Sequence, residues 1–90
     1  MSVDNLIFMD KYYYTYVLSS LKDFKLYVGW TLNLDNRLKK HNNQLVKATK
    51  YRTPLKLVYF EACLSKGKAI EREKALKTGF GRKYLKNRIK

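Results

Sequence analysis

The fold of this chain is decided by residues 12–31, which read YYYTYVLSSLKDFKLYVGWT. The segments from Tyr12 to Ser20 and from Leu26 to Thr31 are rich in aromatic and β-branched residues, and each predicts a strand. The polar residues 21–25 between them are a short connection, which favours an antiparallel hairpin. Because side chains alternate along a strand, the hairpin assigns each of them to one of two faces.

This alternation decides which tyrosines can lie together. Tyr14 and Tyr16 share one face of the first strand, and Tyr27 and Gly29 share one face of the second. The hairpin can therefore bring Tyr16 and Tyr27 to the same face, and we expect Gly29 to leave an opening there for the backbone of a ligand. Packing alone is the alternative, and it would explain most of the eight tyrosines.

The rest of the chain predicts a third strand and three helices in the order β-β-α-β-α-α, a small α+β domain. Residues 1–10 are expected to be a flexible leader, and residues 11–90 a single domain. The expected elements are a helix capped by Asn33 and ending near Asn42–Asn43, a strand over Leu55–Cys63, a helix capped by Ser65 and ending at Gly79, and a last helix over residues 81–89.

The charge of the chain points to a polyanionic partner. Twenty Lys and Arg oppose seven Asp and Glu, a formal net charge of +13. Nucleic acid is the favoured partner and an anionic membrane surface the second candidate. The charge alone also leaves open a basic protein without a binding role, or a ribosome-associated one. The cations are spread through the predicted domain, at positions that include Lys40, Lys50, Arg52 and Arg82, and this distribution suits a binding groove.

Several other classes are excluded by composition. No apolar run is long enough to span a membrane, and the first residues do not resemble a signal peptide. The single Cys63 cannot form an internal disulfide, and no cluster of Cys and His predicts a zinc site. We therefore expect a cytoplasmic protein without a membrane partner.

Glu73 lies in an unusual place for an acidic residue. At about 100° per residue, Ala69, Ile70 and Leu76 fall on one side of the second helix, and Glu73 falls among them. Glu71 points to the opposite side. A carboxylate at the edge of a core must meet a cation, a donor or water. It can form an ion pair with Lys68 or Lys77, or it can line a cleft and hold a metal ion.

Two residues of the first helix show a related pattern. Leu34 and Leu38 form its buried line, and Arg37 and His41 lie beside that line, four residues apart. Each residue taken alone can be a surface side chain. Together they place a permanent cation and a titratable ring over one face of the sheet.

These segments resemble the GIY-YIG nuclease superfamily, and most closely its short, stand-alone bacterial branch, which is related to the nuclease domain of the bacterial excinuclease. The resemblance covers residues 14–88 and rests on separate motifs that agree in order and spacing. The motifs are Tyr27-Val28-Gly29-x-Thr31, Leu34-x-x-Arg37-Leu38-x-x-His41-Asn42 and Ala69-Ile70-Glu71-Arg72-Glu73. The first signature departs from its name, because Gly-Ile-Tyr reads Tyr14-Thr15-Tyr16 here.

The resemblance implies a central three-stranded antiparallel sheet flanked by helices. It also implies that Tyr16 and Tyr27 are the signature tyrosines, that Arg37 and His41 are catalytic, and that Glu73 holds a metal ion. Lys50 and, in the last helix, Asn87 are candidate phosphate contacts, beside the cations Lys40, Arg52 and Arg82.

The implied activity is hydrolysis of a phosphodiester bond by water, with DNA as the favoured nucleic acid. One Mg²⁺ or Mn²⁺ is expected, because two ions need several carboxylates. Tyr16 or Tyr27 would take the proton from water, and the sequence does not choose between them. The alternative is a non-catalytic nucleic-acid-binding module. Target choice could come from DNA shape, from a specificity partner or from self-association.

Overall fold

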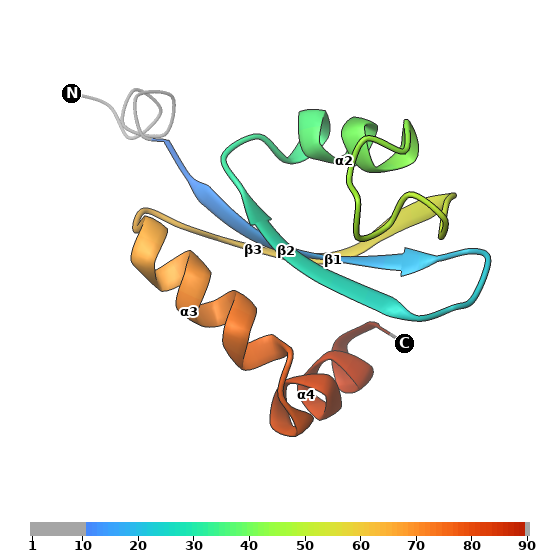
Figure 1. Ribbon diagram of the computed structural model, residues 1–90. Helices are drawn as coiled ribbons and strands as arrows, with labels where there is room; N and C mark the ends of the chain where they lie inside the picture. The colour runs from blue at the N-terminus through green and yellow to red at the C-terminus, as the bar shows by residue number, and fades with distance from the viewer. Residues whose placement is uncertain (1–10, 90) are drawn as a thin grey trace.

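The computed structural model describes residues 11–89 and shows one three-stranded antiparallel sheet with helices on both faces (Figure 1). The strands are β1 (Tyr13–Ser20), β2 (Leu26–Thr31) and β3 (Leu55–Cys63), in the spatial order β2-β1-β3. The helices are α2 (Leu34–Asn42), α3 (Lys66–Leu76) and α4 (Gly79–Ile89). The predicted element order and the α+β fold class are confirmed. The leader expected over residues 1–10 lies outside the described residues.

The two faces of the sheet carry separate apolar clusters. Tyr16 and Leu18 of β1 lie on the face covered by α2, where they pack with Leu34 and Leu38. Val17 lies on the other face, which α3 and α4 cover. There it packs with Val28, Leu76 and Leu85 (Figure 1). The strand alternation thus assigns neighbouring residues of β1 to different layers.

The starts of α2 and α3 follow the capping signals in the sequence. The side chain of Asn33 accepts a hydrogen bond from the backbone nitrogen of Asn36 (2.9 Å), and that of Ser65 accepts one from Lys68 (3.2 Å). Both bonds satisfy backbone groups that the first turn of a helix leaves without partners.

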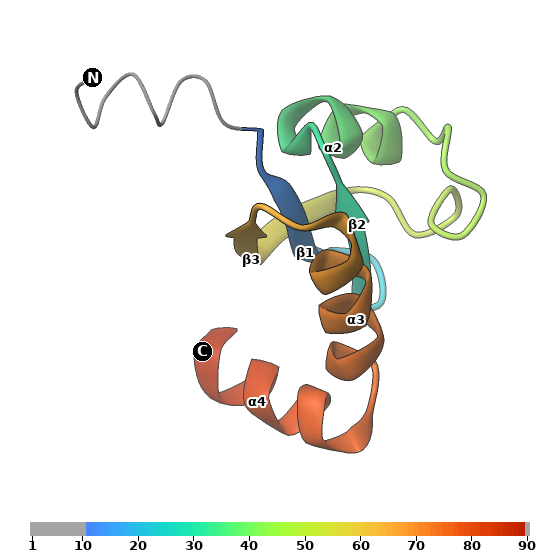
Figure 2. The same cartoon turned by 90° about the vertical axis from the view of Figure 1, so that its left-hand side faces the viewer.

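The predicted end of the second helix at Gly79 is wrong. α3 ends at Leu76, and Gly79 begins α4, which leaves α3 in a new direction (Figure 2). The hydroxyl of Thr78 accepts a hydrogen bond from the Gly81 nitrogen (3.2 Å) at the new helix start. Gly81 also packs so closely on the backbone of Ala75 and Leu76 that a Cβ atom would clash. Glycine is therefore needed to close this corner.

A buried hydrogen bond fixes α3 against the sheet. The Thr15 hydroxyl donates to the carbonyl oxygen of Ala69 at 2.9 Å. Glu73 follows Ala69 by four residues and so lies on the same side of the helix, one turn further along.

Among residues 11–89, no helix is long and apolar enough to cross a membrane.

Candidate active site

Tyr16 is the centre of a polar cluster beneath α2. It lies in the central strand and is 1% exposed. Its ring passes over Gly29 of β2, where a Cβ atom would lie 2.6 Å from the phenol oxygen. The opening expected at Gly29 for a ligand backbone is therefore filled by Tyr16 itself. The absence of a side chain at Gly29 allows the phenol to reach α2.

The phenol oxygen of Tyr16 contacts both predicted residues of α2. It lies 2.8 Å from Nε2 of His41, and it accepts a hydrogen bond from Nε of Arg37 at 3.4 Å. The second signature tyrosine is close as well. The ring centroid of Tyr27 lies 5.1 Å from that of His41 and 6.4 Å from that of Tyr16. The predicted shared face of the two tyrosines is confirmed, and β1, β2 and α2 each contribute to one cluster.

His41 is completely buried and has a partner on each ring nitrogen. Nδ1 lies 2.7 Å from the hydroxyl of Thr49, in the segment between α2 and β3. Burial, with a smaller contribution from the charge of Arg37, lowers the pKa of His41 to about 4. His41 is therefore neutral at neutral pH, with one nitrogen that donates a hydrogen bond and one that accepts.

Thr49 is a member of the cluster that sequence reasoning missed. It lies in an irregular segment, so no periodicity assigns it to a face. The need for a partner at this position follows only from the burial of His41 in the structure, since both nitrogens of a buried imidazole need partners.

The electrostatics of the cluster separate the two tyrosines. Burial raises the pKa of the Tyr16 phenol, and the hydrogen bond from Arg37 only partly opposes this. The Tyr16 phenol oxygen, and after it the hydroxyl of Tyr27, raises the pKa of Arg37. Tyr27 is only half-buried. Tyr16 is thus a buried phenol held from two sides, whereas Tyr27 lies at the more open edge of the cluster.

Glu73 approaches the cluster from the other layer of the fold. α3 packs across β1 and β2. The Glu73 side chain is 18% exposed, whereas that of Glu71 is 73% exposed, which confirms the predicted difference between the two acids. The negative charge of Glu73 contributes to the raised pKa of Tyr16, so the carboxylate lies within electrostatic range of that phenol.

The predicted alternative, an ion pair with Lys77, also forms. An oxygen of Glu73 lies 3.5 Å from Nζ of Lys77, four residues further along α3. The Lys77 side chain is 53% exposed, so the pair is open to water. A pair with one exposed partner contributes about 1 kcal/mol, and it does not prevent the carboxylate from binding another cation.

The donor set around Glu73 suits a hydrated ion. Within residues 11–89, no group of three or more His, Cys, Asp or Glu side chains could enclose a metal. Mg²⁺ keeps several water ligands and is commonly bound through one or two carboxylates and the substrate phosphate. A single carboxylate that is still accessible to water therefore fits Mg²⁺ or Mn²⁺, with the nucleic acid completing the ligand set.

The predicted nucleic-acid contacts do not form one patch. Lys40 and Lys50 lie in and after α2, and the ammonium group of Lys50 stacks over the Tyr51 ring, 4.9 Å from its centroid. Arg82 and Asn87 are exposed on α4, which covers the opposite face of the sheet.

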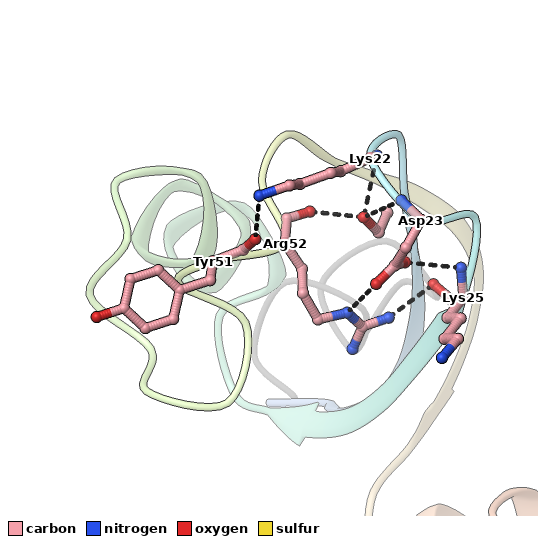
Figure 3. Close-up of polar contacts among 6 residues, drawn as sticks. Lys22, Asp23, Lys25, Tyr51 and Arg52 are labelled. Carbon is pink, nitrogen blue, oxygen red and sulfur yellow. Dashed lines mark hydrogen bonds and ion pairs between the residues drawn. The ribbon is translucent and has the colours of Figure 1, made fainter.

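Arg52 differs from the other predicted contacts because its guanidinium is used within the protein. It binds the carboxylate of Asp23 (3.1 Å) and the carbonyl oxygen of Lys25 (2.9 Å), as Figure 3 shows. This arrangement joins the β1–β2 turn to the segment before β3. Arg52 is the least available of the five predicted contacts.

Comparisons with known proteins identify the family of this fold. The model of the GIY-YIG catalytic domain matches residues 12–87. A UPF0213 protein of Clostridium perfringens is 49% identical over 65 residues, which are 71% of this chain and 69% of the relative. A UPF0213 protein of Staphylococcus saprophyticus is 43% identical over 79 residues, or 87% of this chain and 94% of the relative.

A solved structure shows the same fold. The solution NMR structure of a UPF0213 protein from Bacillus halodurans superposes with a TM-score of 0.52 at 33% identity, and the match covers 84% of this chain and 83% of that one. The departure from the first signature motif lies at Tyr14, whose ring packs edge-on against Phe60 with 6.0 Å between centroids. With the family model matched over most of the chain, this chain belongs to the GIY-YIG catalytic domain family of nucleases and groups there with the UPF0213 proteins.

Proposed function

We propose that this protein is a divalent-metal-dependent endonuclease that hydrolyses phosphodiester bonds of DNA. The observation that carries the proposal is that the guanidinium of Arg37 has no acidic partner in the described part of the chain. Within residues 11–89, no carboxylate lies within 4 Å of its guanidinium, which contacts the Tyr16 phenol instead. An arginine that is partly buried without an acidic partner is a suitable binding site for an external anion such as a phosphate.

Arg37 would bind the oxygens of the scissile phosphate and stabilise the charge that grows on them in the transition state. Water would attack the phosphorus in line as the bond to the leaving oxygen breaks. We assign the proton of that water to the oxygen of Tyr27, which would pass its own hydroxyl proton to the solvent. Tyr27 suits this role because it lies at the open edge of the cluster, whereas Tyr16 is buried with a raised pKa.

Tyr16 and His41 would hold this arrangement in place. Their mutual hydrogen bond, with the bonds to Arg37 and Thr49, connects β1 to α2 and the segment after it. Glu73 would hold Mg²⁺ or Mn²⁺ together with water and the substrate. Such an ion, when bound, supplies positive charge for the leaving oxygen.

A non-catalytic nucleic-acid-binding module is the second candidate. Two observations favour it: Glu73 already has a cationic partner, and the described residues hold no cluster that could enclose a metal. The net charge of +13 would serve binding in either case, with an affinity that falls as salt rises.

Nicking of a supercoiled plasmid with Mg²⁺, with Mn²⁺ and with a chelator tests the proposal. We expect cleavage only with a divalent ion, and a loss of about a hundredfold or more in Glu73→Gln because the ion loses its protein ligand. DNA affinity of this variant should stay equal or rise slightly, since a negative charge is removed near the phosphate.

Two controls separate the metal role from a structural one. Glu71→Gln changes an exposed acid of the same helix, and Lys77→Met removes the ion pair but keeps the carboxylate. Both variants should cleave like the wild type. Cleavage by Glu73→Gln at the wild-type rate would rule out the metal role. A wild-type protein that binds DNA but never nicks it would establish the binding module.

A further inference from the structure

A second basic surface lies away from the Tyr16 cluster, where the end of the β1–β2 hairpin meets α4. A hollow of about 840 Å³ opens there, compared with about 440 Å³ for the hollow beside Arg37. Its apolar lining comes from Phe24, Leu26 and Ile89. We call this surface the hairpin–helix groove.

The groove has a cationic rim. Lys25, Arg82 and Lys86 line it, and among the described residues no acidic side chain does. None of the three forms an ion pair within residues 11–89. Their charges are therefore not neutralised by the fold and are available to an anionic partner.

Phe24 is held at this groove in an unusual way. Its side chain is 77% exposed, and its backbone has a φ of 59°, a left-handed conformation that side chains other than glycine rarely adopt. A turn that served only to reverse the chain would favour glycine or asparagine at this position. A large aromatic ring, displayed to solvent at a strained position, requires another explanation.

The turn that carries Phe24 is fixed by a dense set of hydrogen bonds. The Ser20 hydroxyl accepts from the nitrogens of Lys22 and Asp23 and donates to the carbonyl oxygen of Arg52. The guanidinium of Arg52 in turn holds Asp23 and Lys25 (Figure 3). The backbone nitrogen of Phe24 donates to the carbonyl oxygen of Ser20 at 2.8 Å. The ring is thus presented from a preorganised turn.

We propose that the hairpin–helix groove binds an unpaired segment of nucleic acid, with one base stacked on Phe24 and neighbouring phosphates bound by Lys25, Arg82 and Lys86. An aromatic ring beside a row of cations is the arrangement by which proteins bind single strands. A duplex does not fit it, because paired bases keep their faces stacked inside the helix. This inference rests on the proposed function and specifies its substrate as nucleic acid with unpaired bases.

The position of the groove suits one substrate that reaches both surfaces. β2 is an edge strand of the described sheet. Its first residue, Leu26, lies in the groove, and Gly29 further along lies beside the Tyr16 phenol. These residues are three positions apart, about 10 Å, which is the length of about three stacked nucleotides. A strand that follows the free edge of β2 could therefore lie on Phe24 and pass Arg37.

A second copy of this chain is a poorer occupant of the groove. Each copy has a net charge of +13, and the rim of the groove has the same sign. Like charges brought together in an interface oppose association.

Fluorescence anisotropy with a labelled single strand and with a duplex of the same sequence, both in chelator, tests the inference without cleavage. Phe24→Ala and Phe24→Leu should bind the single strand about tenfold more weakly and the duplex as the wild type does, since both lose the stacked base. Phe24→Tyr should keep the wild-type affinity. Phe80→Ala is the matched control, because Phe80 is 91% exposed on α4 and does not line the groove.

The outcomes separate this inference from the proposed function. Wild-type affinity of Phe24→Ala for the single strand would overturn it. A different pair of results would assign the groove to self-association. Phe24→Ala would bind the single strand more weakly but Phe24→Leu would not, and light scattering would show a dimer for the wild type that Phe24→Ala does not form. If the wild type binds neither oligonucleotide, both proposals fail. If Phe24→Ala shows the expected loss but neither the plasmid nor the labelled single strand is cleaved with Mg²⁺ or Mn²⁺, the groove is retained and the nuclease assignment fails.

Discussion

Each face of the sheet gathers tyrosines around an arginine, but the two arginines have opposite surroundings. On the face covered by α3 and α4, Nε of Arg72 lies 3.0 and 2.9 Å from the two carboxylate oxygens of Glu61. On the face covered by α2, Arg37 contacts the phenol of Tyr16. The residue types are alike, and the presence of an acidic partner separates the two clusters.

The Arg72 cluster is closed on itself. The hydroxyl of Tyr59 donates to Glu61 at 2.8 Å and lies 3.1 Å from that of Tyr84, and the guanidinium of Arg72 stacks over the Tyr84 ring. The charges are neutralised and the cluster joins β3, α3 and α4. This arrangement stabilises the fold, and the carboxylate of Glu61 occupies the guanidinium of Arg72.

An acidic partner separates a structural arginine from a functional one. A half-buried guanidinium with a carboxylate partner contributes to stability, whereas one without such a partner has unused capacity for an anion. Arg37 is of the second kind within the described residues.

The largest expected effect is on Arg37 itself. Arg37→Ala should lower plasmid cleavage about 10²–10³-fold, because a donor to the transition state is lost. The melting temperature should change little, since the variant removes a charge from a very basic protein. DNA affinity should fall only modestly.

Arg72→Ala is the matched control for that variant. Loss of the partly buried pair with Glu61 should lower the free energy of unfolding by about 1–2 kcal/mol. Each kcal/mol corresponds to a fall of about 4–8 °C in melting temperature. Its cleavage rate per folded molecule should match the wild type. Similar losses of cleavage in both variants would contradict the distinction between the two faces.

A smaller effect is expected on the pH dependence of stability. It follows from the buried histidine His41, which the α2 face contains and the Arg72 cluster does not. Its pKa is about 4 in the folded protein and about 6.5 when unfolded, so the unfolded chain takes up a proton first as pH falls. The neutral His41 therefore contributes fully to the free energy of unfolding above pH 6.5. This contribution is lost as the pH falls towards 4, by up to about 1.4 kcal/mol per pH unit.

Urea unfolding at several pH values between 4.5 and 6.5 measures this slope. His41 is the only histidine, so His41→Gln should flatten the curve in this range. Asp23, whose pKa is lowered by hydrogen bonds from Lys25 and Arg52, contributes only below about pH 4. An unchanged slope in the variant would show that His41 is not held neutral.

The smallest expected effect is on the tautomer of His41. If the Tyr16 hydroxyl donates to Nε2, the hydrogen lies on Nδ1 and is accepted by Thr49. Thr49→Val cannot accept it and should shift the hydrogen to Nε2, whereas Thr49→Ser should keep the wild-type tautomer. Nitrogen chemical shifts of the single histidine report this directly. Identical spectra for the wild type and Thr49→Val would contradict the predicted role.

Much of the fold could be predicted because its signals are local. The hairpin, β3 and the starts of α2 and α3 follow from alternation and from capping by Asn33 and Ser65. The corner between α3 and α4 was missed, because Gly79 is equally suited to end a helix or to lie at the start of the next. The close packing of Gly81 on α3, which decides between the two, cannot be read from a pattern.

The candidate site was predictable in most of its members, Thr49 excepted, but not in its contacts. The net charge follows from composition. The faces of the strands and the side of α3 on which Glu73 lies follow from local periodicity, which involves neighbours within four residues. Three features depend on the packing of whole elements. Tyr16 fills the space over Gly29, Thr49 is the partner of His41, and Arg72 has an acidic partner where Arg37 has a phenol. Tyr16 and His41 are 25 residues apart, and Thr15 and Ala69 are 54 apart. Contacts at such separations depend on how whole elements pack together, and this information is absent from any local stretch of sequence.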